Sequence, residues 1–524
     1  MTRQPELAIP FQSTKDMLKK WRKRDFQKTA IVDLDQEEKR ITWGELATEA
    51  DRIAVLLSEM GVKSGDKVAV LSDENIEKLI LWMGIWRYGA VICPLNVEMN
   101  EQHLNEILCS INPVTTFVHT NLKGLNLSKA FEQSTFEFNT WKRAIAGNEN
   151  SDELFERIAS KSADEGGQIN NANTAEDLSC IFCTSGTTSK PKSVVYNHMS
   201  YWLSGLSTLD MLGLTENDRT LEYRSFGWNS AQILSLMPWL QTGLTMHIAK
   251  RFSRKRFFDW IRKHQITFSA GVPTVVNMLL NDPPPPDKRN VPSLRLMTCS
   301  TAPLSPDQWS KFENLYKVKL LQLYGMSEAG WICGNRHYRR KMGTVGPAAK
   351  HQELIIVDAN GNPCAKNIEG EITVGGPQTC QGTISASGDF ENLSKSRIAT
   401  GDLGFLNEDG FVTVTGRTKD LIIRGGVNIA PLEVDNILLK HPKVREAATI
   451  GIPDKIYGEE VMAFVSLKPG VSLSAQEIIK WCNDILPQFK APKQIRFIDN
   501  LPKSDRGKVL REELKNLWLK LTPS

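Results

Sequence analysis

The chain has 524 residues, and its 64 lysine and arginine residues nearly balance its 60 aspartate and glutamate residues, which leaves a net charge of +4. This length exceeds what one simple hydrophobic core supports, so we expect a large domain and at least one more. The near balance of charge, without a dense basic run, gives no reason to expect a nucleic-acid partner.

The N-terminus and the cysteines indicate a broad class of protein. Residues 1–15 contain no apolar core of a signal peptide, and the most apolar window, residues 79–95, is interrupted by Arg87. We therefore predict neither a signal peptide nor a transmembrane helix. The nine cysteines are scattered, which is typical of reduced thiols in a cytoplasmic protein, and we interpret Cys180 and Cys183 as core residues rather than metal ligands.

Strands and helices alternate in the first hundred residues. Residues 28–50 predict two short strands that run into a helix, and the capping-box pair Thr42 and Glu45 marks the start of that helix. A further strand, a helix over residues 77–88 and a strand over residues 90–96 follow. This alternation favours a parallel sheet in an α/β fold.

Two later stretches look like connections. Residues 121–177 are polar and irregular, and we interpret them as surface loops with little function. Residues 281–290, NDPPPPDKRN, predict a stiff polyproline linker between a helix and the next strand, because consecutive prolines favour that extended conformation. We expect the linker to act as a spacer and assign it no ligand.

The most informative stretch is the loop TSGTTSKPKS at residues 184–193. Six hydroxyl residues, one glycine and two lysines present N–H groups, O–H groups and cations to one anion, for which a phosphate is the natural candidate. Short β-rich runs on both sides predict that the loop joins two strands. A Walker A loop is disfavoured because Pro191 removes an N–H and no helix follows. A polar surface hairpin is the alternative, but it does not explain the two lysines that flank the proline.

A second stretch, LQLYGMSEAG at residues 321–330, carries three groups suited to a nucleotide. An apolar strand is expected to run into a loop that holds Tyr324, Ser327 and Glu328. An aromatic face can stack on a base, a hydroxyl can contact a phosphate and a carboxylate can hold Mg²⁺. The stretch on its own is also compatible with a surface turn.

Two stretches nearer the C-terminus complete the pattern. Residues 399–435 predict a β-hairpin with its turn at residues 408–410, and they contain Asp402 and Arg417. The carboxylate of Asp402 has acceptor capacity for two O–H donors. The segment LPKSDRGKVLREEL places Lys508 at the tip of a polar loop that opens a final helix.

These motifs, in this order, resemble those of the acyl-adenylate-forming superfamily, which contains acyl-CoA synthetases, luciferases and the adenylation domains of peptide synthetases. The resemblance runs from about residue 28 to about residue 515. The phosphate loop differs in having Ser189 and Ser193 where the family commonly has glycine, and its Ser-Thr-rich form is similar to that of the crotonobetaine/carnitine–CoA ligase branch.

The resemblance implies an α/β protein with two domains. The N-terminal AMP-binding domain, residues 1–418, is expected to combine mixed and parallel sheets flanked by helices with a β-barrel-like subdomain. The C-terminal α+β domain, residues 419–524, is expected to be small and mobile, with its hinge at Lys419.

The resemblance also assigns the nucleotide contacts. Tyr324 is expected to lie on the adenine, Asp402 to accept hydrogen bonds from both ribose hydroxyls, and Ser327 to meet the α-phosphate. Thr301 stands in the adenine-contacting segment where glycine is usual. The ATP- and AMP-binding residues implied in this way are Thr184, Ser185, Gly186, Thr187, Thr188, Thr301, Ala302, Pro303, Gln322, Tyr324, Gly325, Met326, Ser327, Asp402 and Arg417.

Three residues receive roles in the reaction. Glu328 is expected to coordinate Mg²⁺, and Lys192 to hold the β- and γ-phosphates together with the phosphate loop. Lys508 is expected to bridge the substrate carboxylate and the α-phosphate, because a compact ammonium suits charge that develops near one point.

The implied activity has two half-reactions. ATP first converts a carboxylate into acyl-AMP with release of pyrophosphate, and a CoA thiol then attacks the acyl-AMP. Between the two, the small domain rotates about Lys419, carries Lys508 away and brings Gly425 and Gly426 to the pantetheine tunnel, where glycine permits close approach. The predicted protein is an AMP-forming acid–CoA ligase that uses ATP, Mg²⁺ and coenzyme A.

The identity of the acid stays open. Phe226 and Gly227 stand where many acyl-CoA synthetases have Phe-His and amino-acid-activating domains have Phe-Asp, so an α-amino acid is disfavoured. Trp228 and Trp331 are expected to face the acyl group, which leaves aromatic, short branched and betaine acids as candidates; core packing is the alternative role of both. Arg224 is the candidate partner for the second carboxylate of a diacid.

Other functions remain as alternatives. The main one is a stand-alone adenylating enzyme that loads a carrier protein. An oxygenating luciferase has no specific support, and a nucleotide-binding protein without chemistry is disfavoured because Glu328, Asp402, Arg417 and Lys508 are all present. The expected partners are thus a small carboxylic acid, ATP and CoA, and the sequence does not fix the oligomeric state.

Overall fold

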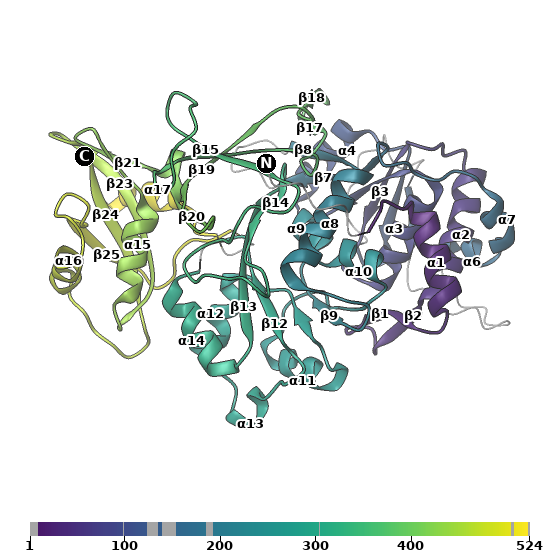
Figure 1. The fold of residues 1–524 in the computed structure, drawn as a ribbon, viewed down its shortest axis with the longest axis horizontal. Coiled ribbons are helices and arrows are strands. Elements are labelled where there is room, and N and C mark those ends of the chain that lie inside the picture. The colour runs from purple at the N-terminus through teal and green to yellow at the C-terminus, as the bar shows by residue number, and fades with distance from the viewer. Residues whose placement is uncertain are drawn as a thin grey trace.

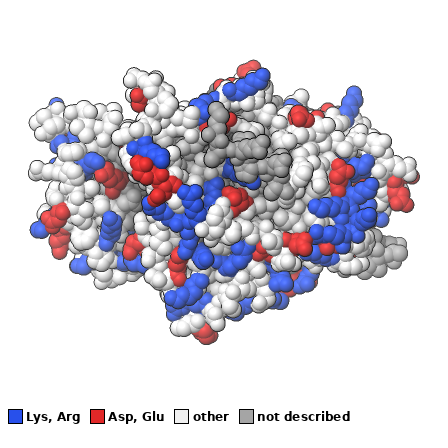
Figure 2. All heavy atoms as spheres, viewed as in Figure 1, with Lys and Arg blue, Asp and Glu red and all other residues white. Residues whose placement is uncertain are grey.

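The computed structural model describes residues 9–97, 99–122, 135–138, 153–184, 192–302, 304–504 and 508–521. Figure 1 shows a large lobe of sheets and helices and a smaller α+β lobe formed by the C-terminal part of the chain. This arrangement confirms the expected fold class. The face drawn in Figure 2 carries both acidic and basic side chains, and the basic ones are densest at the right of the view.

One extended sheet of the large lobe contains the strands on either side of the phosphate loop. Its order within the described residues is β18-β17-β8-β7-β4-β3-β5-β6. The pairs among β3 to β7 are parallel, whereas β7–β8, β8–β17 and β17–β18 are antiparallel. The bounds are β3 Lys67–Leu71, β4 Val91–Leu95, β5 Thr115–His119, β6 Thr135–Phe138, β7 Leu178–Thr184, β8 Lys192–Asn197, β17 Gly382–Ile384 and β18 Phe390–Asn392.

A second extended sheet ends in the strands that carry the other nucleotide motif. Its order in the described part of the chain is β14-β13-β12-β11-β9-β10-β1-β2, with parallel pairs from β1 through β13 and an antiparallel strand at each edge. The expected parallel sheet is therefore confirmed. The bounds are β1 Thr29–Asp33, β2 Lys39–Thr42, β9 Arg219–Glu222, β10 Thr245–Ile248, β11 Phe268–Ser269, β12 Leu296–Cys299, β13 Lys319–Met326 and β14 Gly330–Gly334.

Helices cover both sheets, and α2 begins at the predicted cap. The Thr42 hydroxyl accepts a hydrogen bond from the Glu45 N–H at 3.2 Å, and the Glu45 carboxylate accepts one from the Thr42 N–H at 2.8 Å. The helices are α1 Thr14–Asp25, α2 Trp43–Glu59, α3 Ile76–Tyr88, α4 Glu101–Ile111, η1 Thr120–Leu122, α6 Glu153–Ala159, α7 Ala163–Gln168, α8 His198–Leu212, α9 Asn229–Ala231, a π-helical turn η2 Gln232–Leu236, α10 Met237–Thr242, α11 Arg254–His264, α12 Pro273–Asn281, α13 Pro286–Arg289 and α14 Pro306–Tyr316.

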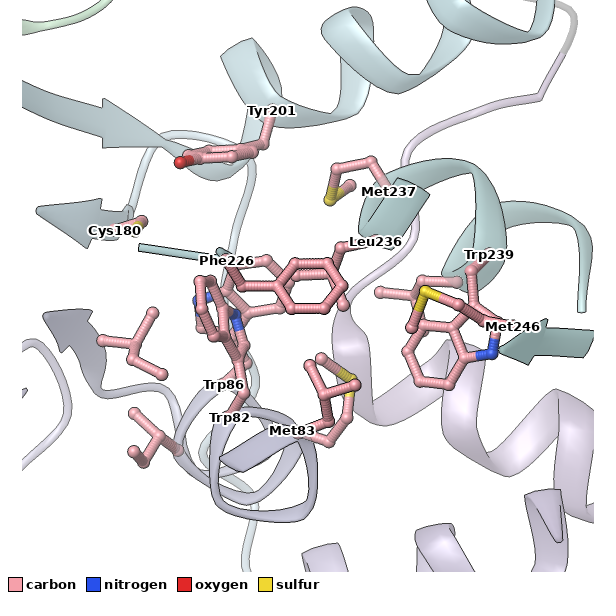
Figure 3. Packing of buried hydrophobic residues seen from close by; sticks show 14 of the residues in the cluster. Trp82, Met83, Trp86, Cys180, Tyr201, Phe226, Leu236, Met237, Trp239 and Met246 are labelled. Atoms are coloured by element: carbon pink, nitrogen blue, oxygen red, sulfur yellow. The ribbon is translucent and has the colours of Figure 1, made fainter. Parts of the chain in front are cut away.

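Helix α3 forms the centre of the main hydrophobic core and is buried along its whole length. Figure 3 shows its residues Trp82, Met83 and Trp86 gathered with Phe226 and Trp239. The most apolar window of the sequence thus forms a core helix and strand β4. None of the helices described here combines the length and the apolar character needed to cross a bilayer.

Two sequence expectations about connections are wrong. Residues 121–177 contain β6, α6 and α7, and Phe138 and Phe155 from this region are buried, with their ring centroids 6.2 Å apart. The carbonyl of Gly166 in α7 also accepts a hydrogen bond from buried Arg87 at 2.5 Å. A few buried apolar residues hold these elements against the core, although most of their neighbours in sequence are polar. The proline-rich linker includes the short helix α13, because a proline is well tolerated in the first turn of a helix.

A small antiparallel sheet stands where a β-barrel-like subdomain was expected. Its order is β15-β16-β19-β20. The predicted hairpin is confirmed: β19 and β20 pair in antiparallel fashion, and the Gly410 N–H closes the turn on the Asn407 carbonyl at 3.0 Å. The bounds are β15 Glu353–Val357, β16 Gly370–Gly375, β19 Ile398–Leu406 and β20 Val412–Arg417.

The small lobe begins directly after this sheet. A 3-10 turn, η3, connects β20 to a sheet in which β24 pairs with β21, β23 and β25. Helices pack on this sheet around a separate apolar core. The bounds are η3 Thr418–Asp420, β21 Ile422–Arg424, β22 Val427–Ile429, α15 Pro431–Lys440, β23 Val444–Asp454, β24 Gly458–Leu467, α16 Ala475–Asn483, β25 Gln494–Phe497 and α17 Arg511–Leu521.

Candidate active site

The centre of the candidate site is the buried carboxylate of Asp402. In the β19–β20 ladder Asp402 lies opposite Arg417, and the Arg417 Nε is 2.8 Å from one carboxylate oxygen. Tyr324 lies on β13 of the second extended sheet. Its hydroxyl donates a hydrogen bond to the other carboxylate oxygen of Asp402 at 2.6 Å. Three residues that the sequence assigned to one nucleotide are therefore in contact, although Tyr324 and Asp402 are 78 residues apart in sequence.

The environment of Tyr324 keeps its hydroxyl protonated. Burial, followed by the adjacent negative charge of Asp402, raises the pKa of the Tyr324 phenol well above its ordinary value. A neutral phenol is a donor to the carboxylate.

The position of the Tyr-Gly-x-Ser-Glu motif differs from expectation. Tyr324, Gly325 and Met326 belong to strand β13, and only Ser327 and Glu328 lie in the turn before β14. A Cβ atom on Gly325 would meet the carbonyl oxygen of Gly330 at 2.3 Å, so the tight β13–β14 pairing requires glycine at that position.

Two residues that sequence reasoning missed hold this turn in place. The Ser327 carbonyl accepts hydrogen bonds from the Tyr196 hydroxyl at 2.9 Å and from the Asn229 side-chain amide at 3.1 Å. Tyr196 lies on β8 and Asn229 on α9, so no local pattern connects either residue to the motif. Both are buried, and they fix the backbone that presents Glu328.

Glu328 and Lys192 both influence Cys380. The Glu328 carbonyl accepts a hydrogen bond from the Cys380 N–H at 2.8 Å. Burial raises the pKa of the Cys380 thiol to about 12; the Glu328 charge acts in the same direction and the Lys192 charge opposes it. Lys192 is half-exposed, with its ammonium 3.4 Å from Glu391. The carboxylate and the ammonium predicted to act on the phosphates thus both act on the pKa of the same thiol.

The phosphate loop itself falls largely outside the described residues. Strands β7 and β8 pair up to Thr184 and Lys192, which confirms that the loop joins two antiparallel strands. The remaining predicted phosphate-binding residues, and Pro303 of the adenine-contacting segment, lie outside the described residues; those of the loop are Ser185, Gly186, Thr187 and Thr188.

The adenine-contacting segment follows β12. Thr301 adopts a left-handed backbone conformation with φ of 76°, which suits the glycine that usually occupies this place and is strained for a β-branched residue. Ala302 lines the cleft between the lobes. Gln322 lies opposite Cys299 in the β12–β13 ladder and is buried, with its carbonyl bonded to Asn335.

Lys508 lies in a cleft of about 210 Å³ between the two lobes. Ala302 and Arg417 line the cleft from the large lobe, and Lys508 and Arg511 line it from the small lobe. Burial lowers the pKa of the Lys508 ammonium to about 8, and the positive charges of Arg417 and Lys419 act in the same direction. The negative charges of Asp402 and Asp420 oppose this shift. The structure thus brings Lys508 to the same place as Asp402 and Arg417.

The residues predicted to face the acyl group separate into two kinds. Phe226 is 1% exposed and packs in the core beside Trp82 and Trp86 (Figure 3), while Trp331 is 2% exposed and donates its indole N–H to Thr208 at 2.9 Å. Both side chains are buried, and for Trp331 core packing was the alternative role that the sequence left open.

Gly227 and Trp228 lie at the start of α9. Trp228 is half-buried at the start of α9, two residues before Ser230. A Cβ atom on Gly227 would touch Asn96 at 3.3 Å, so little room remains there. Arg224 is engaged with Glu222, its Nε and one Nη lying 2.9 and 2.6 Å from the two carboxylate oxygens.

Gly425 and Gly426 form the two-residue turn between β21 and β22. Their φ angles are 57° and 83°, the pair of positive values that a tight hairpin turn of this kind requires. Neither glycine is among the described residues that line the cleft containing Lys508.

The chain matches the family model described as AMP-binding enzyme over residues 18–383. The chain belongs to this family. Residues 433–508 of this AMP-binding enzyme match a second model, described as the AMP-binding enzyme C-terminal domain, so both lobes are represented. The resemblance inferred from the motifs is confirmed.

Relatives of this AMP-binding enzyme include several CoA ligases. It is 28% identical to oxalate–CoA ligase from Arabidopsis thaliana, over 87% of this chain and 89% of the relative. It is 26% identical to crotonobetaine/carnitine–CoA ligase from Salmonella paratyphi C, over 91% of this chain and 93% of the relative. Among solved structures, ATP-bound MatB from Rhodopseudomonas palustris is 25% identical, with a TM-score of 0.85 over 97% of this chain and 100% of that one.

Proposed function

We propose that the protein is an AMP-forming carboxylic acid–CoA ligase. The observation that carries the proposal is the contact of Tyr324 and Arg417 with Asp402, together with the cleft that Arg417 and Lys508 both line, in a chain of the AMP-binding enzyme family. These residues supply an aromatic face, an acceptor for ribose and two cations, which are the groups that adenylate formation needs.

In the proposed first half-reaction, the large lobe holds the nucleotide and the small lobe supplies charge. Each oxygen of Asp402 has one protein partner, and a carboxylate oxygen has a second acceptor position, so both ribose hydroxyls can bind without displacing Tyr324 or Arg417. In this proposal, the Lys508 ammonium offsets the negative charge that develops as the acid carboxylate attacks the α-phosphate.

The donor set around Glu328 fits Mg²⁺. Within the described residues, no group of three or more His, Cys, Asp or Glu side chains is arranged to hold a metal ion. Mg²⁺ usually takes one or two carboxylates together with phosphate oxygens and water, so the single carboxylate of Glu328 suffices. The ion would neutralise phosphate charge, while Lys192 and the phosphate loop orient the leaving pyrophosphate.

In the proposed second half-reaction, the small lobe turns about Lys419. This residue is exposed in η3, between the last strand of the large lobe and the first strand of the small lobe, so the proposed domain boundary falls between residues 418 and 419. The turn would withdraw Lys508 and bring Gly425 and Gly426 to the CoA thiol. Lys419→Pro tests this hinge, with pyrophosphate release expected to persist and thioester formation to fall; equal loss of both would contradict it.

The acyl group is proposed to lie beside Gly227 and Trp228. The core positions of Phe226 and Trp331 support this narrower assignment. The Glu222 carboxylate already balances the charge of Arg224, so a diacid has a weaker electrostatic case than a monoacid. Because the relatives include ligases named for oxalate and for crotonobetaine or carnitine, the acid panel below contains both a diacid and monoacids.

The decisive experiment measures pyrophosphate release and CoA consumption in parallel with ATP and Mg²⁺. The acids are isobutyrate, benzoate, crotonobetaine and oxalate, one from each class. Release of pyrophosphate that requires an acid, followed by loss of the free CoA thiol, supports the proposal. Acid-dependent release without CoA consumption would favour a carrier-protein acceptor, and no release with any acid would contradict the function.

A further inference from the structure

The segment that carries Lys508 is closed on itself at its base. The Ser504 N–H donates to the Lys508 carbonyl at 2.8 Å, and the Leu510 N–H donates to the Pro502 carbonyl at 3.0 Å. Lys503 and Val509 also pair as an isolated β-bridge. The two described legs of the loop are thus fixed to each other, and the second leg runs directly into Arg511, the first residue of α17.

Arg511 joins this loop to three other elements. Its guanidinium is paired with Asp435 of α15, and its Nε donates to the Thr449 carbonyl of β23 at 3.1 Å. Its other terminal nitrogen lies 3.9 Å from the carboxylate of Asp420 in η3. Arg511 is therefore hydrogen-bonded to the lobe core and forms a longer ion pair with the turn that contains the proposed hinge.

The partners of Arg511 are themselves held in place by further contacts. Asp435 is 4% exposed, and its other oxygen accepts a hydrogen bond from the Thr449 N–H at 2.6 Å. Asp420 immediately follows Lys419, and Arg511 follows Lys508 by three residues. A planar guanidinium with a fixed fork of donors can set the relative orientation of three groups, whereas a lysine ammonium cannot.

We propose that Arg511, through Asp420, is a positioning residue that sets Lys508 relative to the hinge turn. When η3 has the conformation seen here, the Asp420–Arg511–Asp435 bridge fixes the base of the loop and directs Lys508 into the cleft. The bridge serves adenylate formation and has no part in thioester formation, during which Lys508 is withdrawn. This inference rests on the proposed function.

The charges around Lys508 make the pH dependence of adenylate formation a second test of the proposal. Its neighbours are Asp402 on β19, Arg417 on β20, and Lys419 and Asp420 on η3. The Asp420 charge is one of the two that raise the pKa of Lys508 against burial. Loss of that charge therefore lowers the pKa of Lys508, and the alkaline limb of adenylate formation moves to lower pH.

Asp420→Asn tests the bridge with little risk to the fold, because Asp420 is partly exposed and Arg511 keeps its partner Asp435. With the panel acid that gives the fastest pyrophosphate release, the rate is expected to fall about fivefold, the size of one partly buried ion pair, with the alkaline limb shifted to lower pH. The second variant, Arg511→Lys, keeps a cation beside Asp435 and is expected to lose between about tenfold and 10²-fold of that rate, as for a misplaced reacting group.

The control and the second half-reaction separate positioning from a general structural effect. Glu433→Gln breaks an ion pair of 2.8 Å between α15 and Lys490 in the same lobe, and it should leave both half-reactions unchanged. Both test variants should form thioester from supplied acyl-AMP and CoA at the wild-type rate.

Equal loss of the two half-reactions, or no loss in either, would overturn the inference while wild-type pyrophosphate release still supports the proposed function. Wild-type protein that releases no pyrophosphate with any acid would overturn both.

Discussion

The two sides of the cleft hold their functional groups in different ways. On the large lobe, Asp402 is buried with one partner on each oxygen, and those partners come from two different sheets. On the small lobe, Lys508 is held through the backbone bonds of its loop and through Arg511. The groups proposed to face the nucleotide are thus already in place within one lobe, whereas the charge proposed to complete the site depends on the orientation of the second lobe.

The largest effect on activity among these variants is expected from removing the Asp402 carboxylate of the large lobe. Asp402→Ala removes the proposed ribose acceptor and leaves Arg417 and Tyr324 without it. We expect kcat/KM for ATP to fall about 10²-fold, which corresponds to one charged hydrogen-bonding group, measured by acid-dependent pyrophosphate release. Asp409→Ala, at the exposed turn of the same hairpin, is the control. Similar ATP kinetics in the two variants would rule out the ribose role.

The role of Lys508 on the small lobe is tested by the pH dependence of adenylate formation. The folded pKa of Lys508 is about 8, below the ordinary value of 10.5, so the ammonium is present below pH 8 and is lost above it. Adenylate formation is therefore expected to decline above pH 8, approaching about tenfold per pH unit. Lys508→Arg stays charged, and whatever activity it retains should lack this decline. An unchanged alkaline limb in that variant would assign the limb to another group.

A smaller effect tests the contact between the two sheets. Tyr324→Phe keeps the ring and removes the hydrogen bond to Asp402. We expect KM for ATP to rise between about threefold and tenfold, as for one hydrogen bond, with little change in kcat. Tyr338→Phe, which removes an exposed hydrogen bond to Asp210 at 3.1 Å, is the matched control. If kcat falls and KM does not, the hydroxyl acts in the reaction rather than in binding.

The smallest effect is expected from relieving backbone strain at Thr301 in the large lobe. Thr301→Gly removes a side chain from a left-handed backbone position, so the free energy of unfolding should rise by about 1 kcal/mol. Thermal unfolding measures the gain. Lys317→Gly, at another left-handed position that ends α14, shows how much glycine gains there when the side chain removed is not β-branched. A destabilised Thr301→Gly protein would show that the threonine side chain makes contacts that outweigh the strain.

Much of the fold could be predicted because its signals are local. The capping box of Thr42 and Glu45, the β19–β20 turn and the alternation of strands and helices each depend on residues close in sequence. The order of the motifs then identified the family. Residues 121–177 were misjudged because a few buried aromatic residues, such as Phe138 and Phe155, carry little periodic signal among polar neighbours.

The site was predictable where a motif carries it and not where tertiary contacts do. Tyr324 and Asp402 were named from the sequence, but their hydrogen bond joins two sheets and has no local signature. The support that Tyr196 and Asn229 give to the Glu328 turn was missed for the same reason. Trp331 was expected at the acyl group because of its place after Glu328, whereas its indole bond to Thr208 depends on the packing of α8.

The most direct test of the account follows both half-reactions in Lys508→Ala. With ATP, Mg²⁺ and the best panel acid, pyrophosphate release in a single turnover should fall about 10²-fold to 10³-fold, because a positioned charge at the reacting phosphorus is lost. Thioester formation from supplied acyl-AMP and CoA should continue at the wild-type rate. Wild-type pyrophosphate release by the variant would contradict the claim that the second lobe completes the site.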